Sequence, residues 1–438
     1  MKEVDIIIIG AGPGGYETAA EAAKMGLRTI IIERNFLGGT CLNQGCIPTK
    51  ALCKSAELLQ SIAEASQFGI NVSGVEASFA DAAKRKDEIV EALRAGVEMV
   101  LKGVEIVRGE ARFVDKYTVE VDGERFTAPK IIIATGSQPA MLPIEGAELA
   151  ISSDQMLAAT SLPKSMCVIG GGVIGMEFAS ILAAYGTEVT VIEYCKEILP
   201  PFDKDISKRL KSLLSRKGVN IITSAAVTAI RPGKIVEYES KGKQLSVECE
   251  EVLMAVGRRP VIPAGCAEVG IEVGKRGIVV DDNFMTAIPG VYAIGDVNGV
   301  CMLAHAASAQ GAAVLGKNVN TAVIPSAVFT NPECSMVGLT EDYCKEKGMS
   351  IKVAKSLYRA NGKAMTMGDT DGMVKIVIDE NSHQILGCHI LGAHAADLVQ
   401  EVATAMANNL TIEAIARTVH IHPSLTEIVL AAANTLNE

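Results

Sequence analysis

Two cysteines five residues apart, Cys41 and Cys46, are the residues whose type and spacing most directly suggest chemistry. They lie in residues 38–50, which read GGTCLNQGCIPTK. Such a pair binds metal, exchanges electrons or is coincidental, and metal is the weakest interpretation because no second Cys or His pair stands nearby to complete a tetrahedral site. Pro48 favours a helix start at Cys46, where the helix dipole stabilises a thiolate. We therefore expect a pair poised for thiol–disulfide exchange and no bound metal.

Two other groups could assist a thiol. Lys50 follows Cys46 by one helical turn and is either a positive charge near that sulfur or a solvated surface lysine. His422 precedes Glu427 by five residues, and a carboxylate can orient an imidazole that acts as a base on a thiol. A structural role for His422 is an equally good interpretation from these residues alone, because the histidine and the cysteines stand at opposite ends of the chain.

A glycine-rich turn near the N-terminus has the surroundings of a dinucleotide site. The apolar residues 4–9 precede it, the helix-forming residues 16–25 follow it, and a second apolar run at residues 29–32 ends in Glu33. The glycines of the turn are Gly10, Gly12, Gly14 and Gly15. In this fingerprint the glycines let the backbone approach a pyrophosphate at the helix N-terminus, and the acid binds ribose hydroxyls. We expect strand, turn, helix and strand in that order.

The same order recurs later in the chain. A strand is expected at residues 166–169, a helix at 176–185 and a strand at 188–192 that ends in Glu193. The turn between the first strand and the helix reads Gly170-Gly171-Gly172-Val173-Ile174-Gly175. Two such units form an internal repeat. No arginine directly follows Glu193, and a carboxylate there would repel a 2′-phosphate, so we expect this unit to prefer NAD to NADP.

Three further apolar runs end in small residues that would let the backbone approach a cofactor. They end at Ala134-Thr135-Gly136, at Gly257 and at Gly295-Asp296. Each could equally be a plain buried strand followed by a turn. Asp296 is either a turn cap or a hydroxyl ligand, and the residues do not decide between the two.

Composition bounds the class of protein. The 438 residues carry a formal charge of −10, with 49% hydrophobic and 21% charged residues, so disordered, fibrous and nucleic-acid-binding classes fit poorly. No apolar run approaches the roughly 18 residues of a membrane helix. We expect a soluble cytoplasmic chain whose other nine cysteines are buried thiols. The expected fold is α/β, with two Rossmann-like dinucleotide-binding domains and a C-terminal α+β domain.

In their order along the chain these motifs resemble the flavin-dependent pyridine nucleotide-disulfide oxidoreductases, and most closely the branch that oxidises dihydrolipoamide. The resemblance covers nearly the whole chain, through residues 10–15, 38–50, 134–137, 170–177, 257–258, 295–296, 302–305 and 420–427. Residues 329–338 and 370–375 also resemble this branch. We expect an FAD domain at 1–145, an NAD domain at 146–263, a central segment at 264–325 and a dimerisation domain at 326–438.

The resemblance implies FAD in the first unit and NAD in the second. The implied FAD contacts are Gly10, Gly12, Gly14, Gly15, Glu33, Gly39, Thr40, Lys50, Ala111, Ala134, Thr135, Gly136, Asp296 and Ala304. The implied NAD contacts are Gly170, Gly172, Val173, Ile174, Gly175, Glu193, Val227 and Gly257. In this family Cys41 exchanges with the substrate and Cys46 faces the flavin, while Lys50 and Glu177 flank the reactive edge of its ring.

The resemblance also implies partners. Members are two-fold dimers in which the C-terminal region lends its histidine, here His422 held by Glu427, to the partner's cysteine pair. The implied carriers of the substrate are lipoyl domains and the acyltransferase core of a 2-oxo acid dehydrogenase complex, or the lipoyl carrier of glycine cleavage. A reductase of another small disulfide or of a quinone is an alternative, and so is a flavoprotein kept as a structural subunit, although the intact catalytic set argues against lost catalysis.

The chain departs from the family pattern in three respects. It is rather short, Gln44 occupies a loop position that is commonly apolar, and Asn331 stands where a histidine is often seen. None of these departures touches the catalytic set. Gln44, beside the cysteine pair, could alter its redox potential or the fit of the substrate.

Overall fold

The first glycine turn follows the central strand of a parallel sheet with strand order β18-β8-β2-β3-β4. Its strands are β2 (Ile6–Ile9), β3 (Thr29–Glu33), β4 (Glu105–Arg108), β8 (Lys130–Ile133) and β18 (Val291–Ala293). The isoleucine-rich strands β2, β3 and β8 are buried almost throughout, as expected where both faces of a parallel sheet are covered.

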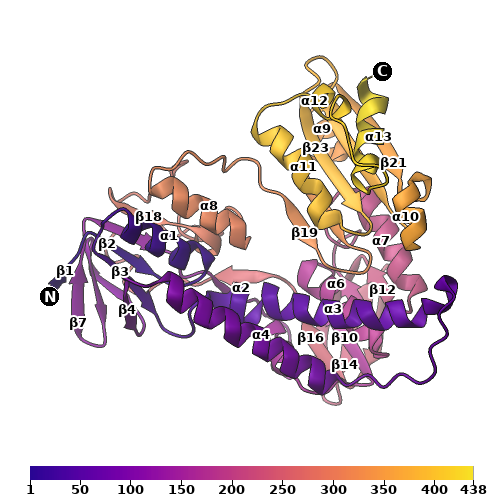
Figure 1. Cartoon of the computed structure of the whole chain (residues 1–438). Helices are drawn as coiled ribbons and strands as arrows, with labels where there is room; N and C mark the ends of the chain where they lie inside the picture. Colours follow the sequence, from indigo (N-terminus) through magenta and orange to yellow (C-terminus); the bar gives the residue numbers. More distant parts are fainter. Residues whose placement is uncertain (438) are drawn as a thin grey trace.

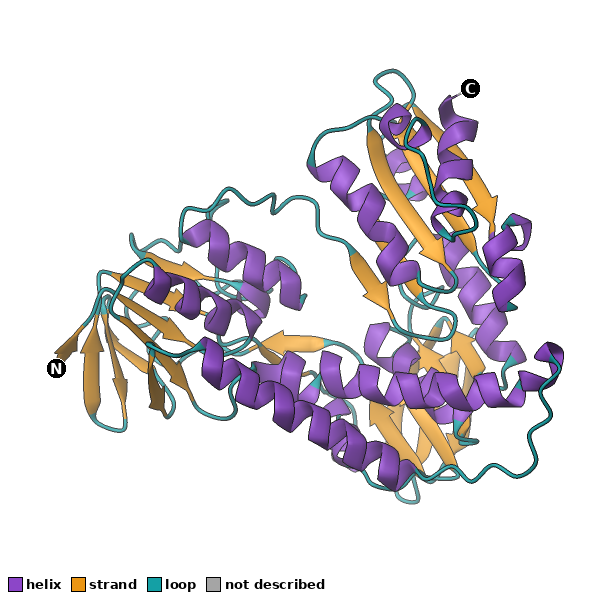
Figure 2. Cartoon of the chain, viewed as in Figure 1, coloured by secondary structure: helices purple, strands orange, loops and turns teal. Residues whose placement is uncertain are grey.

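The computed structural model describes residues 1–437 and is shown in Figures 1 and 2.

Two helices that are distant in sequence cover one face of this sheet together. These helices are α1 (Pro13–Lys24) and α8 (Ala304–Val314), which pack along each other. The chain thus returns to the first unit late, through β18 and α8, as expected for a central segment that completes it. Helix α1 begins at Pro13 rather than at Tyr16, because proline suits the first helical position.

A smaller sheet, of order β1-β7-β6-β5, completes the first unit. Its strands are β1 (Lys2–Glu3), β5 (Arg112–Asp115), β6 (Thr118–Val121) and β7 (Glu124–Thr127).

The cysteine segment forms two consecutive helices. The short α2 (Gly39–Gln44) carries Cys41, and the long α3 (Cys46–Ala63) begins at Cys46, as the sequence predicts. The turn η1 (Ala65–Phe68) and the long helix α4 (Phe79–Val100) follow, and α4 packs along α3. In Figure 1, α3 and α4 extend from the first unit to the second.

The second unit repeats the design of the first. Its parallel sheet has the order β12-β11-β10-β16, with β10 (Ser165–Ile169), β11 (Glu188–Glu193), β12 (Asn220–Thr223) and β16 (Glu251–Met254). Helix α6 (Val173–Ala184) follows the second glycine turn and packs on α3, and α7 (Lys204–Arg216) follows β11. The unit also contains η2 (Ala147–Leu149), α5 (Ser153–Ala158) and an antiparallel sheet of β13 (Ala225–Arg231), β14 (Ile235–Ser240) and β15 (Lys243–Glu248).

Short strands connect the two nucleotide-binding units. β9 (Ser137–Pro139) pairs antiparallel with β17 (Arg258–Pro260), so the chain enters and leaves the second unit side by side.

The C-terminal unit is a mainly antiparallel sheet flanked by helices. Its strand order is β19-β20-β23-β22-β21, formed by β19 (Ser326–Val328), β20 (Cys334–Gly338), β21 (Ile351–Leu357), β22 (Met373–Asp379) and β23 (Ile385–Leu391). Its helices are α9 (Glu341–Glu346), η4 (Tyr358–Ala360), α10 (Gly362–Met367), α11 (Ala395–Ala407), α12 (Ile412–Ala416) and α13 (Thr426–Asn437). Helices α11 and α13 pack on the sheet and bury its apolar face.

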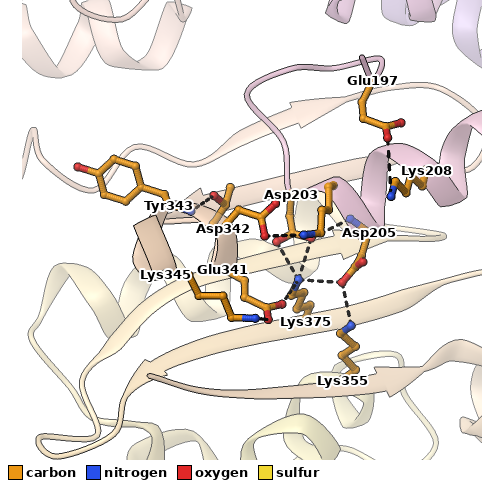
Figure 3. Close-up of polar contacts among 12 residues, drawn as sticks. Glu197, Asp203, Asp205, Lys208, Glu341, Asp342, Tyr343, Lys345, Lys355 and Lys375 are labelled. Carbon is orange, nitrogen blue, oxygen red and sulfur yellow. Dashed lines mark hydrogen bonds and ion pairs between the residues drawn. The ribbon is translucent and has the colours of Figure 1, made fainter. Parts of the chain in front are cut away.

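A buried ion cluster joins the C-terminal unit to the second unit (Figure 3). The ammonium group of Lys375, on β22, is fully buried and lies 2.9 Å from Asp203, 2.8 Å from Asp205 and 2.7 Å from Glu341. Asp203 is the N-cap of α7, in the second unit. Hydrogen bonds from Lys345 and Lys375 lower the pKa of Glu341 to about 2. Separating the units would take away two of the three carboxylates that surround this buried charge, which is destabilising.

Within residues 1–437, no helix is both long and apolar enough to cross a membrane.

Candidate active site

A cavity of about 1080 Å³ lies where the three units meet. Its volume is at the upper end of the range for small-molecule sites. The predicted site residues that line it are Gly10, Gly12, Gly14, Glu33, Gly39, Thr40, Cys41, Cys46, Lys50, Ala134, Thr135, Gly136, Val173, Ile174, Glu177, Asp296 and Ala304. The structure therefore brings residues implied for FAD, for NAD and for thiol chemistry into one site.

Cys41 and Cys46 are free thiols that both line this cavity. The hydrogen bond from Cys41 outweighs the effect of burial and, together with the charge of Lys50, lowers the pKa of Cys46 to about 7. The same hydrogen bond raises the pKa of Cys41 well above its ordinary value. The pair therefore favours the thiolate on Cys46 rather than on Cys41. Gln44 is exposed between them and lines the same cavity.

An ion pair links the cysteine helix to the second unit. Lys50 on α3 donates from Nζ at 2.9 Å to both carboxylate oxygens of Glu177, which is buried on α6. The backbone N–H of Phe329 also donates to Glu177, at 2.9 Å, and the Phe329 ring lies 4.7 Å from Lys50 Nζ. Phe329 begins a segment of the resemblance, residues 329–338, but its contacts with Lys50 and Glu177 join segments that are distant in sequence.

The first glycine turn has the shape that a dinucleotide requires. Gly10 has φ +102°, and a Cβ atom there would lie 2.4 Å from the carbonyl oxygen of Ala134. A Cβ on Gly15 would lie 1.9 Å from the carbonyl oxygen of Gly10, so helix α1 approaches the strand end closely. The Glu33 carboxylate accepts from the N–H of Ala11 at 2.7 Å. Turn, helix N-terminus and acid therefore fit the pyrophosphate and ribose of FAD.

A smaller cavity of about 60 Å³ adjoins Glu33. Buried Ala111 lines it together with Gly10 and Thr135. Ala111 therefore lies beside Glu33 and the first glycine turn, and its contact with the adenine stays a prediction.

Asp296 belongs to a network that extends to the second unit. Its carboxylate accepts a hydrogen bond from the Ser137 hydroxyl, and Arg258 Nε lies 2.8 Å from that hydroxyl. Arg258 directly follows Gly257, one of the implied NAD contacts. Ser137 and Arg258 belong to the motifs of the resemblance, but their contact with Asp296 joins segments that are distant in sequence.

The second glycine turn reproduces the first. Gly170 has φ +109°, and a Cβ on Gly175 would lie 2.0 Å from the carbonyl oxygen of Gly170. Glu193 accepts from the N–H groups of Gly171 and Cys195. Val227 lies on β13 and packs against an apolar cluster of the second unit, outside the lining of the described cavities.

His422 lies outside the lining of the described cavities, on the C-terminal unit. Its Nδ1 atom is 2.9 Å from a carboxylate oxygen of Glu427, and its side chain is 81% exposed. Hydrogen bonds from the Ser424 N–H and from His422 hold the pKa of Glu427 below its ordinary value. Within one chain the structure builds the His422–Glu427 pair but does not bring it to the cysteines.

The sequence matches known proteins over its full length. Residues 4–311 match the pyridine nucleotide-disulphide oxidoreductase family, and residues 324–433 match the dimerisation domain of that family. Similar curated proteins are named dihydrolipoyl dehydrogenase. One from Geobacillus stearothermophilus is 39% identical and one from Bacillus subtilis (strain 168) is 40% identical, each over 98% of this chain and 96% of the relative.

A solved structure has the same architecture. It is the Cu(II) complex of the HOCl-induced flavoprotein disulfide reductase RclA from Escherichia coli, with a TM-score of 0.88 and 29% identity over 99% of this chain and 100% of that one. The chain therefore belongs to the pyridine nucleotide-disulphide oxidoreductase family, a family of disulfide oxidoreductases that use FAD and NAD.

Proposed function

We propose that this chain oxidises protein-bound dihydrolipoamide to lipoamide and passes the electrons to NAD⁺. The observation that carries the proposal is the Cys41–Cys46 thiol pair, which shares one cavity with residues of both dinucleotide turns. Relatives named dihydrolipoyl dehydrogenase, matched over 98% of the chain, support the choice of substrate.

The chemistry begins with the disulfide form of the pair. His422 accepts the proton of one substrate thiol, and the resulting thiolate attacks the sulfur of Cys41. The Cys41–Cys46 bond breaks, and Cys46 leaves as a thiolate, which its low pKa favours. The second substrate thiol then attacks the substrate sulfur bound to Cys41. Lipoamide is released, and Cys41 takes up a proton.

The remaining steps need the cofactors. When bound, FAD accepts the electron pair from the dithiol and NAD⁺ accepts it as hydride, so that each dihydrolipoamide yields one NADH and one proton. Lys50 and Glu177, at 2.9 Å from each other, fix the positive charge beside Cys46. Gly10, Gly15 and Glu33 would hold FAD, and Gly170, Gly175 and Glu193 would hold NAD.

The histidine in this scheme is that of a second copy of the chain. Exposed His422, oriented by Glu427, is available to another protomer, and residues 324–433 match a dimerisation domain. We propose a homodimer in which each chain completes its partner's cysteine site. Within a chain, we propose that the units are 1–145, 146–263, 264–325 and 326–438.

The substrate carriers belong to the same proposal. They are the lipoyl domains of a 2-oxo acid dehydrogenase complex, with its acyltransferase core, or the lipoyl carrier of glycine cleavage. We place the reaction in the cytoplasm.

An anaerobic titration of the purified yellow protein tests this function. Dihydrolipoamide is added first and NAD⁺ second, while flavin absorbance and NADH formation are recorded. We expect long-wavelength absorbance, typical of a thiolate beside oxidised flavin, and then NADH. A flavin that NADH reduces but dihydrolipoamide leaves oxidised would overturn the choice of substrate and point to another disulfide.

The His422→Gln variant tests the role of His422 as the base. We expect the rate of dihydrolipoamide oxidation to fall by about 10²–10⁴-fold, the usual contribution of a positioned base. NADH oxidation by a dye that takes electrons directly from the flavin should be unchanged. An equal loss in both reactions would contradict the assigned role.

A further inference from the structure

Asn43, between the two cysteines, makes hydrogen bonds that span Cys41. Its Nδ2 atom donates to the carbonyl oxygens of Leu37 and Gly39, each at 2.9 Å. These carbonyls precede Cys41 and Asn43 follows it, so the side chain ties the two ends of the short helix α2 together. A helix of six residues gains little stability from its own backbone, and side-chain contacts of this kind decide its geometry.

Arg94, on the long helix α4, holds that asparagine in place. Its Nε and Nη2 atoms donate to Asn43 Oδ1 at 3.0 and 2.8 Å. Arginine only donates and carbonyls only accept, so this network allows a single orientation of the carboxamide. The guanidinium also lies 4.3 Å from the ring centroid of Phe36, just before the glycines that open α2. Arg94 therefore contacts a residue on each side of Cys41, namely Phe36 before it and Asn43 after it.

These contacts do not reach the sulfur atoms. The charges that shift the pKa of Cys46 are those of Lys50 and Glu177. Arg94 is anchored on α4, which packs along α3, the helix that begins at Cys46. The network thus ties the segment that carries Cys41 to a helix packed against the one that carries Cys46.

We infer that Arg94 is a positioning residue of the redox centre, which acts through Asn43 to hold Cys41 at the distance from Cys46 that disulfide formation requires. The inference concerns the cysteine pair of the proposed function, but it does not depend on which disulfide is the substrate. Without Arg94, α2 gains freedom and the effective concentration of one thiol at the other falls. The disulfide then becomes easier to reduce.

The test measures the redox equilibrium of the pair in the full-length holoenzyme. Wild type and Arg94→Met are equilibrated in glutathione buffers of graded ratio and alkylated, and the peptides are quantified by mass spectrometry. We expect about a tenfold smaller equilibrium constant for disulfide formation in Arg94→Met, which is about 30 mV for a two-electron couple. Arg85→Met, an exposed position on the same helix, should leave the constant unchanged.

A double-mutant cycle with Asn43→Ala separates positioning from general loosening. If Arg94 acts through Asn43, Asn43→Ala alone shifts the constant, and Arg94→Met adds nothing in that background. Arg94→Lys, which keeps one donor, should restore part of the constant. Equal shifts of the constant by Arg94→Met in both backgrounds, or an unchanged constant, would overturn the inference. If Arg94→Met does not fold, the constant is measured in Arg94→Lys and Asn43→Ala instead. An unchanged constant in both variants would overturn the inference.

Discussion

The two nucleotide-binding units use the same turn in different surroundings. In both, the first glycine has a left-handed φ near +100°, the last approaches the carbonyl of the first, and a glutamate accepts from the backbone of the turn. The first turn, however, is covered. A Cβ on Gly39 would lie 2.5 Å from the Cα of Gly12, and a Cβ on Gly14 would lie 3.0 Å from Ala307 of α8.

The second turn is covered at Gly171, whose carbonyl accepts from the Leu199 N–H, but it is open at the next glycine. A Cβ added to Gly172 would meet no atom of residues 1–437 within 4 Å, and Ile174 occupies the position equivalent to Gly14. The turn itself therefore does not distinguish the two sites. The cysteine segment and α8 enclose the first dinucleotide, which suits a cofactor that stays bound, whereas the second site is open to a cofactor that exchanges.

Alanine at the last glycine of each turn, where the helix approaches the turn closely, should have the largest effects and tests whether the two turns act independently. Gly15→Ala places a Cβ 1.9 Å from a carbonyl oxygen, and Gly175→Ala places one 2.0 Å from its equivalent. We expect Gly15→Ala to purify with less than about a tenth of the wild-type flavin. We expect Gly175→Ala to stay yellow but to oxidise NADH about 100-fold more slowly, because displacing bound NADH by about an ångström costs about that factor. Loss of flavin from Gly175→Ala would contradict the independence of the two turns.

A milder change at the acid of the second unit should weaken NAD binding alone. Glu193→Gln keeps the shape of the side chain but loses a charge-assisted acceptor for the ribose hydroxyls, so we expect the KM for NAD⁺ to rise about tenfold with kcat nearly unchanged. Steady-state kinetics at saturating dihydrolipoamide measure this, and flavin content is the control. The comparison would fail if Glu193→Gln lowered flavin content.

The contact of Lys50 with Glu177, which joins the two units, can be tested through the pKa of Cys46. Lys50 lowers the pKa of Cys46, which is about 7, so Lys50→Met should raise that pKa by about one unit toward the ordinary thiol value. The thiolate then forms only at higher pH, and at pH 7 about one pair in ten carries it. A pH titration of the long-wavelength absorbance of the reduced protein measures the shift, and an unchanged midpoint would mean that Lys50 does not act on Cys46.

The smallest effect is expected at the open turn. Gly172→Ala meets free space in the protein, so Tm should stay within about a degree of wild type, as for surface changes that touch nothing. In the dinucleotide fingerprint this glycine lets the backbone approach the pyrophosphate, so we expect the added methyl group to raise the KM for NAD⁺ a few-fold. Thermal unfolding and NAD⁺ kinetics on one preparation would separate the two effects. A large loss of Tm would show that the second turn is covered after all.

Local sequence signals predicted the features that a short segment determines. Both glycine turns, their acids and the helix start at Cys46 follow from residues within one strand–turn–helix unit. Helix α1 starts three residues earlier than its helix-forming composition predicts, because Pro13 belongs both to the glycine turn and to the first turn of the helix. The resemblance supplied the Lys50–Glu177 pair, since no spacing relates residues on two distant helices.

Contacts between units could not be predicted from the sequence. Met373–Asp379 has the alternation of a strand, but nothing in it shows that Lys375 is fully buried, because its carboxylate partners lie far away in the chain. Arg94 likewise looks like one of several surface cations on α4, and only the packing of α4 on the cysteine segment pairs it with Asn43. The reach of His422 to another chain stays a prediction.

The Lys375 cluster also bears on how such a protein can be recombined. Residues 146–263 look like a module, with their own sheet and nucleotide turn, yet they carry Asp203 and Asp205, whose buried counter-charge belongs to the C-terminal unit. A chimaera that exchanges this module for one without these acids would remove two of the three carboxylates around the buried ammonium group and leave it with Glu341 alone, which is destabilising. The second unit and the C-terminal unit are therefore best engineered as a pair.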